Sequence, residues 1–348
     1  MTKRVFVGEV PMGGGSPVTV QSMTNTDTRD FDATIAQIRR LAEAGCDIVR
    51  MSVYDQACVA QVRALCDASP VPLVADIHFD HRLAIGALEN GIAKVRINPG
   101  NIGGEDKVRA LCDCLKRHHA PVRIGVNSGS LEKDILNKHG GVTAQGMVES
   151  ALGHVRLLEK YGFDDIVLSL KASDVRRTVE AYRLVSRACD YPLHLGVTEA
   201  GTVGVGHVKS AIGIGALLLD GIGDTIRVSL SGDPLPEVEA GLDILRALDL
   251  RAGVNVVSCP TCGRTCIDVE GIARAVREAT KRLKTPLTVA VMGCVVNGPG
   301  EAAEADLGIA GGKDGGVLFV RSEKPRPVHG DLKTALLAAI DGILAAKG

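Results

Sequence analysis

Short apolar runs alternate with amphipathic helical patterns along the first two thirds of the chain. Between residue 17 and about residue 230, each run of β-branched residues ends in a polar residue and is followed by a helical pattern of 10–18 residues, which indicates βα units. We expect strands at 18–21, 47–51, 73–76, 93–97, 122–126, 165–170, 193–197 and 225–228. We expect helices at 32–44, 56–68, 82–90, 107–118, 145–160, 174–188, 207–219 and 235–247, with N-caps at Asp32, Thr143 and Ser173.

Eight βα units of this length predict an α/β fold that begins with a (β/α)8 TIM barrel. An open doubly wound sheet is the alternative, and it favours a glycine-rich phosphate-binding turn after the first strand. The early glycine run at 13–15 precedes a strand instead. The barrel is therefore the preferred architecture.

A second pattern begins after a linker at 248–253. It predicts strands at 254–258, 287–292, 307–310 and 317–320 and helices at 269–282 and 332–346. These elements describe a small α+β domain of roughly a hundred residues, which is within the usual range for a domain. We therefore expect a TIM-barrel domain at 1–250 that binds the substrate and an α+β domain at 251–348.

Composition narrows the classes of function. Hydrophobic residues make up 45% of the chain, but aromatic residues only 3%, and Trp is absent, so aliphatic side chains must build the core, as in parallel sheets. Few aromatic rings and a net charge of −1 argue against a nucleic-acid reader. The chain has no apolar segment of 18 residues and no leader pattern, which predicts a cytoplasmic protein without membrane contact.

Cations stand at five of the predicted strand ends, where TIM barrels carry their chemistry. These cations are Arg50, Arg96, Arg123, Lys171 and Arg227. Period-two alternation places three polar residues on the same inward faces, Asn98, Asn127 and Ser229. Like charges in a semi-enclosed cup repel one another unless an anion is bound, and the planar guanidinium matches phosphate oxygens. The pattern predicts a phosphate or diphosphate ligand, and the alternative is that each arginine pairs with a neighbouring acid at the rim.

Acidic groups and histidines accompany these cations. Asp76 and His78 close the third strand, and His194, Thr198 and Glu199 close the seventh. A carboxylate in a cationic cup stays ionised and can act as a base or orient an alcohol. Each histidine is equally compatible with a core or rim position. The glycine run at 201–206 opens the seventh helix, where backbone amides can hold a phosphate, but glycines alone are a weak signal.

Cysteine spacing in the second domain indicates a metal site. Ten cysteines without a secretion signal are interpreted as reduced thiols or metal ligands, and six scattered ones fit the core. A Cys-x2-Cys motif follows one predicted strand and a third cysteine follows another, which suits zinc or an iron–sulfur cluster. A Gly-Pro-Gly turn at 298–300 brings a carboxylate back towards the third cysteine. The candidate ligands are Cys259, Cys262, Cys294 and Glu301.

Alternatives stay open at this point. A structural zinc ion would take the three cysteines and Cys266, whereas a disulfide between Cys259 and Cys262 is disfavoured because no thioredoxin-like pattern surrounds the pair. An easily displaced oxygen ligand suits a reactive iron site, and such a site beside a phosphorylated alcohol indicates reductive chemistry. The rivals are a pterin- or corrinoid-linked barrel with an accessory cluster and a zinc-stapled binding module without catalysis.

Five stretches resemble the bacterial 4-hydroxy-3-methylbut-2-enyl diphosphate synthase (GcpE) family, in order and over essentially the whole chain. They are Val-Arg-Ile-Asn-Pro-Gly-Asn at 95–101, Arg-Ile-Gly-Val-Asn-Ser-Gly-Ser-Leu at 123–131, Leu-Gly-Val-Thr-Glu-Ala-Gly at 195–201, Ser-Cys-Pro-Thr-Cys-Gly-Arg at 258–264 and Gly-Cys-Val-Val-Asn-Gly-Pro-Gly-Glu at 293–301. The resemblance implies an iron–sulfur oxidoreductase of the non-mevalonate isoprenoid pathway. Its reaction would convert 2-C-methyl-D-erythritol 2,4-cyclodiphosphate to 4-hydroxy-3-methylbut-2-enyl diphosphate by reductive dehydroxylation and ring opening.

The same resemblance implies roles for particular residues. Cys259, Cys262 and Cys294 would hold a 4Fe–4S cluster, and Glu301 would ligate its fourth iron and yield to a substrate oxygen. Diphosphate contacts are implied for Arg50, Arg96, Arg123, Lys171 and Ser229, and positions near the reacting carbons for Asn98, Asn127 and Glu199. Together with the strand-end pattern, this assigns catalysis to Glu199 and Glu301 and substrate binding to Arg50, Asp76, His78, Arg96, Asn98, Arg123, Asn127, Lys171, Arg227 and Ser229.

Partners are implied as well. Flavodoxin or ferredoxin would supply electrons, and the chain would form a homodimer in which the cluster domain of one subunit caps the barrel of the other. Cys266 departs from the family motif. If this thiol replaced Glu301 as a ligand, no iron would be open to substrate.

Overall fold

The computed structural model describes residues 1–294, 296, 300 and 304–347 of the 348-residue chain. The chain divides into two compact units, Met1–Leu250 and Arg251–Gly348. Within the described residues, no helix combines the length and the apolar character needed to cross a membrane.

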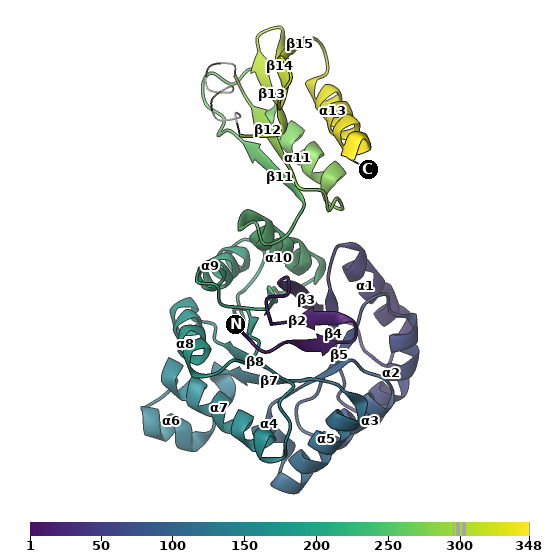
Figure 1. Cartoon of the computed structure of the whole chain (residues 1–348), viewed down its shortest axis with the longest axis vertical. Helices are drawn as coiled ribbons and strands as arrows, with labels where there is room; N and C mark the ends of the chain where they lie inside the picture. The colour runs from purple at the N-terminus through teal and green to yellow at the C-terminus, as the bar shows by residue number, and fades with distance from the viewer. Residues whose placement is uncertain (295, 297–299, 301–303, 348) are drawn as a thin grey trace. The chain divides into compact units, whose positions relative to one another are not determined.

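The first unit is a barrel of eight parallel strands surrounded by helices (Figure 1). Its strands are β3 (Thr19–Met23), β4 (Ile48–Ser52), β5 (Leu73–Asp76), β6 (Lys94–Ile97), β7 (Val122–Asn127), β8 (Ile166–Lys171), β9 (His194–Leu195) and β10 (Thr225–Ile226). Neighbours pair in the order β8-β7-β6-β5-β4-β3-β10-β9, and a parallel bridge from Leu168 to Leu193 joins the two ends of this order. The predicted TIM barrel is confirmed, although β9 and β10 are shorter than expected.

Amphipathic helices cover the outside of the barrel. They are α1 (Phe31–Glu43), α2 (Gln56–Ala68), α3 (His81–Glu89), α5 (Glu105–His118), α7 (Ala144–Lys160), α8 (Val175–Ala188), α9 (Val205–Leu219) and α10 (Leu235–Ala247), with short additions at α4 (Pro99–Ile102), η1 (Ser128–Ser130) and α6 (Lys133–His139). Thr143 caps α7 as predicted. The caps predicted at Asp32 and Ser173 are wrong, because Asp30 and Asp174 accept the first backbone amides of α1 and α8.

A hairpin that the sequence analysis missed closes one end of the barrel. β1 (Val5–Val7) and β2 (Val10–Met12) pair in antiparallel fashion, and the purple hairpin lies across the barrel opening in Figure 1. Val5, Val7 and Met12 are fully or almost fully buried, and they form one apolar cluster with Ile48, Val74 and Val167 from the barrel strands. The hairpin therefore forms an apolar floor under the barrel interior.

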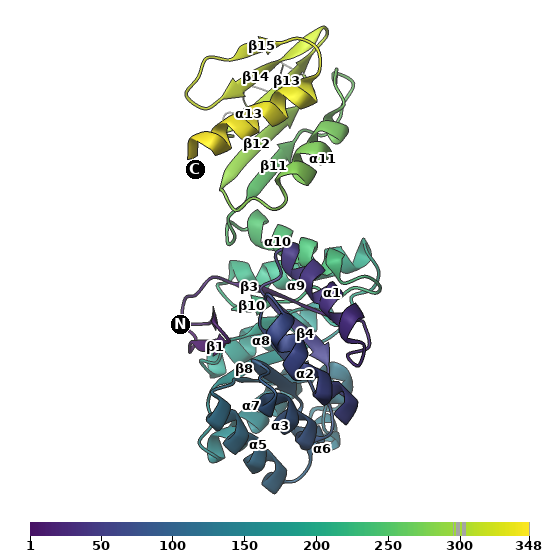
Figure 2. The same cartoon turned by 90° about the vertical axis from the view of Figure 1, so that its right-hand side faces the viewer.

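In the part of the second unit that the structure describes, two helices pack on one face of a five-stranded sheet, as Figure 2 shows. Its strands are β11 (Val254–Ser258), β12 (Leu287–Met292), β13 (Leu307–Gly312), β14 (Gly315–Val320) and β15 (Arg326–Val328), and its helices are α11 (Val269–Thr280) and α13 (Leu332–Lys347). β11, β12 and β13 are parallel, whereas β14 and β15 run antiparallel to their neighbours. The predicted elements are present, and the edge strand β15 was not foreseen.

Alternating side chains of β12 pack into apolar clusters on both faces of this sheet. Leu287, Val289 and Val291 pack with the helices in one apolar cluster, whereas Ala290 and Met292 belong to a second cluster on the other side. Both faces of β12 are therefore buried, which fixes its register and the position of the cysteine loop that follows it.

Candidate functional site

Cationic side chains line the interior of the barrel. Arg50, Arg96, Arg123 and Lys171 are each no more than 8% exposed, although arginine and lysine are rarely buried without a partner. The apolar residues that alternate with them on β6 and β7, such as Val95 and Ile124, belong to the core packed against the helices. Because successive side chains of a strand point to opposite faces, these cations point into the barrel. We call Arg50, Arg96, Arg123, Lys171 and Arg227 the cationic cup.

Asp76 organises one side of the cup. Its carboxylate accepts a hydrogen bond from Arg96 Nη1 at 3.0 Å, and its oxygens lie 3.9 Å from Arg50 Nε and 3.5 Å from His78 Nε2. Burial raises the pKa of this carboxyl, but the charge of Arg50, the hydrogen bond with His78 and the charge of Arg96 outweigh burial and hold the pKa below its usual range. Asp76 is therefore ionised, and it orients two arginines rather than standing free as a base.

Glu237 organises the opposite side, and the sequence analysis missed it. Its carboxylate accepts two hydrogen bonds of 3.3 Å from Arg227 and further ones from Ser22 Oγ at 3.0 Å and the Leu230 amide at 2.9 Å. Glu237 is 3% exposed and stands on the buried face of α10. An acid on the otherwise apolar, core-facing stripe of this helix is the sequence signal that could have found it.

Ion pairs with acids therefore account for only some of the cations in the cup. Arg123 Nη1 donates to Ser169 Oγ at 3.3 Å, while Arg123 Nε is buried without a hydrogen-bond partner among the described residues. Burial first, and then neighbouring arginines, lower the pKa values of Arg123 and Lys171 well below their usual ones. A cup that disfavours its own positive charge is relieved by a bound anion.

Two glycines make room for the cations. A Cβ atom at Gly125 would lie 2.6 Å from Arg96 Nε, and one at Gly196 would lie 2.7 Å from Lys171 Nζ and 2.5 Å from the carbonyl oxygen of Arg227. No side chain fits at such distances. The close approach of backbone to cation therefore requires glycine at both positions.

The remaining predicted site residues lie around the mouth. Asn98 follows β6 and is buried, Asn127 ends β7 in register with Lys171, and Ser229 is half-buried after β10. His78 contacts Asp76 as described. Glu199 is exposed, and its φ of 52° is unusual for a residue with a side chain. Such strain concentrates at functional sites, which makes the loop after β9 a candidate functional segment.

The cysteines stand at one edge of the second sheet. β11 and β12 are parallel neighbours, so Cys259 after β11 and Cys294 after β12 emerge at the same edge. The Gly293 amide donates to Cys259 Sγ at 3.1 Å, and the Cys262 amide donates to Thr265 Oγ1 at 3.1 Å. The backbone amide of Arg264 lowers the pKa of the Cys262 thiol. All ten cysteines are free thiols.

This arrangement fits an iron–sulfur ligand set in donor chemistry. Reduced thiols at a common sheet edge, one with an amide hydrogen bond to its sulfur, are what such clusters use. Among the described residues, however, no three His, Cys, Asp or Glu side chains are gathered closely enough to hold a metal ion. Glu301, the fourth candidate ligand, lies outside the described residues, as do Asn297, Gly298 and Pro299.

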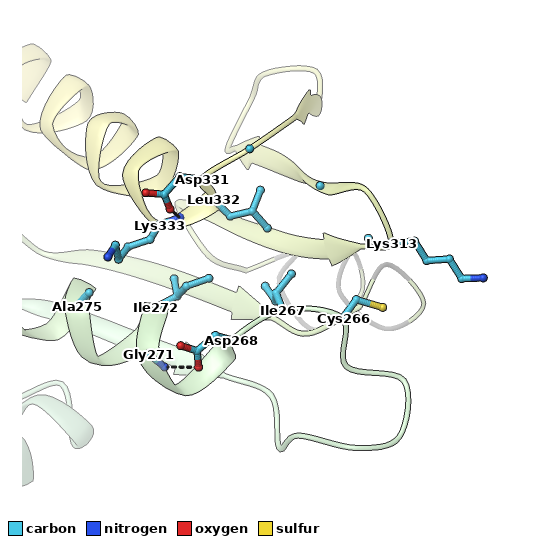
Figure 3. Close-up of a pocket in the computed structure, with 13 residues that line it drawn as sticks. Cys266, Ile267, Asp268, Gly271, Ile272, Ala275, Lys313, Asp331, Leu332 and Lys333 are labelled. Carbon is cyan, nitrogen blue, oxygen red and sulfur yellow. Dashed lines mark hydrogen bonds between the residues drawn. The ribbon is translucent and has the colours of Figure 1, made fainter.

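Cys266 faces a cavity of about 510 Å³ in the second unit (Figure 3). Its amide donates to the Gly293 carbonyl at 2.8 Å, and its exposed thiol donates to the Arg264 carbonyl at 3.3 Å. Lys313 and Lys333 also line the cavity. The backbone of Cys266 thus supports the loop that carries Cys294.

The fold and the site define a class of protein, a (β/α)8 barrel with a buried cationic cup and an α+β unit that has a cysteine after each of two neighbouring parallel strands. The family model of the GcpE TIM-barrel domain matches residues 2–242, and that of the GcpE protein C-terminal domain matches residues 255–341. The chain belongs to the GcpE family.

Close relatives carry one name. The 4-hydroxy-3-methylbut-2-en-1-yl diphosphate synthase (flavodoxin) of Geobacter sulfurreducens is 56% identical over 348 residues, covering 99% of each chain. The protein of the same name from Caldanaerobacter subterraneus subsp. tengcongensis is 58% identical over 324 residues, covering 93% of this chain and 91% of the relative.

Solved structures share the fold of the barrel. The N-acetylneuraminic acid synthetase of Leptospira borgpetersenii serovar Hardjo-bovis superposes with a TM-score of 0.51 at 13% identity, covering 71% of this chain and 90% of that one. The dihydropteroate synthase of Yersinia pestis gives a TM-score of 0.50 at 13% identity, covering 72% and 100%. At this identity the likeness concerns the fold alone.

Proposed function

We propose that this chain catalyses the reductive dehydroxylation and ring opening of 2-C-methyl-D-erythritol 2,4-cyclodiphosphate to 4-hydroxy-3-methylbut-2-en-1-yl diphosphate, the product named in its relatives. It is an oxidoreductase of isoprenoid biosynthesis. The observation that carries the proposal is the buried cup, in which cations outnumber the two carboxylates that contact them. A diphosphate supplies the missing negative charge, and the name of the relatives requires a diphosphate.

The cup residues bind the diphosphate and stabilise charge as the ring opens. Arg50, Arg96, Arg123 and Lys171 contact phosphate oxygens, with Ser229 and Arg227 beside them. When the ring C–O bond breaks, its electron pair stays on a phosphate oxygen, and fixed cations stabilise that oxyanion. Ion pairs with Asp76 and Glu237 keep Arg50, Arg96 and Arg227 in place before the substrate arrives, so these three need little reorganisation.

Other residues position the carbon skeleton. Asn98 and Asn127, which follow the same strands as Arg96 and Arg123, face the reacting carbons. Asp76 and His78 act through the arginines that they orient. Glu199 stands at the mouth, where its carboxylate holds or delivers a proton to the departing hydroxyl group.

The proposed cofactor is a 4Fe–4S cluster held by Cys259, Cys262, Cys294 and Glu301. When bound, it supplies single electrons and a Lewis-acidic iron to the substrate oxygen. The reduced thiols at one sheet edge support this assignment. Flavodoxin, which is named with the relatives, is the proposed electron donor, with ferredoxin as the alternative. In the proposed homodimer, the second unit of one subunit caps the barrel of the other.

Anaerobic turnover tests the activity. The chain, purified without oxygen and supplied with reduced flavodoxin and the cyclic diphosphate, should release the open-chain diphosphate, detected by mass spectrometry. Arg123→Ala should weaken substrate binding by about 30-fold or more, on the order of 2 kcal/mol, because a buried charge pair is lost. Arg117→Ala, at an exposed position on α5, is the matched control. Unchanged affinity in Arg123→Ala would contradict the role of the cup.

A further inference from the structure

Beneath the cationic cup lies a buried lysine to which the proposed reaction gives no role. Lys94 is the first residue of β6, and alternation puts it on the same inward face as Arg96, one step deeper in the barrel. It is in register with Val74 on β5, which belongs to the apolar cluster around the N-terminal hairpin. Lys94 therefore lies between the cup and the apolar floor. Its exposed fraction is 0%.

The amine of Lys94 has no protein partner. Its Nζ atom is buried without a hydrogen bond to any described residue, and both ring nitrogens of the equally buried His194 are in the same position. An unpaired buried polar group is costly, and an unpaired buried ammonium is far more costly. Groups of this kind occur where something other than the protein completes the site.

The surroundings of Lys94 make its charged form still less favourable. The charges that act on Lys94 are those of Arg123 and Arg50, and the barrel interior also holds the titratable groups of Asp76, Arg96, Lys171 and His194. The carboxylate of Asp76 is already engaged by Arg96 and Arg50. Burial, followed by the charges of Arg123 and Arg50, lowers the pKa of Lys94 well below its usual value. With the cup empty, burial without a hydrogen-bond partner among the described residues favours the neutral amine of Lys94 over its ammonium form.

We propose that Lys94 is a charge-compensating residue of the cup, which takes up a proton from solvent when the diphosphate binds above it and releases that proton when the product leaves. This rests on the proposed function, which places a diphosphate in the cup. The step is a proton transfer alone, from amine to ammonium, with no change in electrons or covalent bonds of the substrate. Lys94 is a positioning residue, because it acts through the field of the cup and not on the reacting atoms.

Ring opening increases the negative charge that the proton on Lys94 would balance. The cyclic diphosphate carries one ionised oxygen on each phosphorus, whereas the opened diphosphate gains one further ionisable oxygen on its terminal phosphorus. The anion in the cup therefore becomes more negative as the reaction proceeds. An ammonium group at Lys94 stabilises that added charge from below, in a low-dielectric interior where such an interaction is strong.

Calorimetry with the oxidised holoenzyme tests the proposal without turnover. The cyclic diphosphate has no group that titrates near neutral pH, so protons taken up on binding go to the protein. Titrations at pH 8 in two buffers with different heats of ionisation should give an uptake of about one proton for wild type. Lys94→Met should lose this uptake, and Lys107→Met, at an exposed position on α5, should keep it.

The affinity should show the same linkage. A site that gains a proton on binding loses affinity as pH rises, by up to about tenfold per pH unit between the free and bound pKa values. Wild type should show this slope above pH 8, and Lys94→Met should show a flatter one. Lys94→Met should also raise the unfolding temperature of the substrate-free protein, because it removes an unpaired buried amine. A merely structural lysine would give the opposite shift.

The outcomes separate this proposal from the function on which it rests. If the wild-type protein does not bind the cyclic diphosphate, the proposed function fails. If it binds without taking up a proton, or if Lys94→Met takes up as many protons as wild type, the role of Lys94 is overturned while the function stands. Absence of proton uptake in the wild-type titration overturns the role of Lys94 without any variant, and Lys94→Gln serves as the second neutral variant should Lys94→Met fail to fold.

Discussion

Replacing Asp76 by Asn tests whether one buried carboxylate holds the cup together. The carboxylate is 5% exposed, accepts a hydrogen bond from Arg96 at 3.0 Å and lies 3.9 Å from Arg50. Removing one partner of a buried ion pair typically costs about 3–5 kcal/mol, because the remaining charge loses its counterion. Asn keeps the shape and one acceptor oxygen. We therefore expect the lower end of this range, about 3 kcal/mol.

Thermal unfolding of the full chain measures this cost. In a unit of this size, 1 kcal/mol shifts Tm by about 2–4 °C, so Asp76→Asn should unfold about 6–12 °C below wild type at pH 7. Circular dichroism at the barrel transition is the assay. Asp67→Asn, at an exposed position on α2, is the matched control and should stay within about 0.5 kcal/mol of wild type.

The pH dependence of this effect has a defined sign. The folded pKa of Asp76 lies below its ordinary value, because Arg50, His78 and Arg96 together outweigh burial. Such a group stabilises the native state above its unfolded pKa of about 3.9, and this stabilisation is lost as pH falls towards the folded pKa. The difference between wild type and variant should be constant near pH 7 and shrink below about pH 4. A variant that unfolds within about 2 °C of wild type at pH 7 would refute the reasoning.

Three further substitutions test the geometry of the two sites. Gly196→Ala should reduce turnover and substrate affinity, because its Cβ would lie 2.7 Å from Lys171 Nζ, whereas Gly215→Ala, which meets nothing within 4 Å, should not. Cys294→Ala should lose most of the iron and acid-labile sulfide measured after anaerobic purification, and a full complement of both would remove Cys294 from the ligand set. Glu301→Ala should keep the cluster and lose most turnover, so an active variant would disprove its proposed role.

The barrel could be predicted because its physical causes are local and repeated. Each strand is a short apolar run and most outer helices have one apolar stripe, so the change of period marks the elements. The N-termini of the helices were harder to predict, because capping depends on which of several polar side chains reaches the first backbone amides of the helix. Asp30 and Asp174 do so, rather than the neighbours Asp32 and Ser173.

The cations of the cup could also be predicted, since strand ends and alternation place them. The pairing of each cation could not be predicted, because it depends on which side chains meet in the folded barrel. Glu237 reaches Arg227 from the helix that follows β10 and reaches Ser22 across 215 residues of sequence. Whether an arginine is paired or free to bind an anion is decided by such contacts, and no spacing rule encodes them.

The N-terminal hairpin explains why an anion can reach the cationic cup only from the opposite end of the barrel. Its three-residue strands are too short to give a periodic signal, so the hairpin could not be predicted from the sequence. In the fold, Val5, Val7 and Met12 seal the interior below Lys94 with apolar contacts. An apolar floor offers no counterion and little dielectric screening, so the charges above it act on one another strongly. The open mouth is the side from which the proposed diphosphate would reach them.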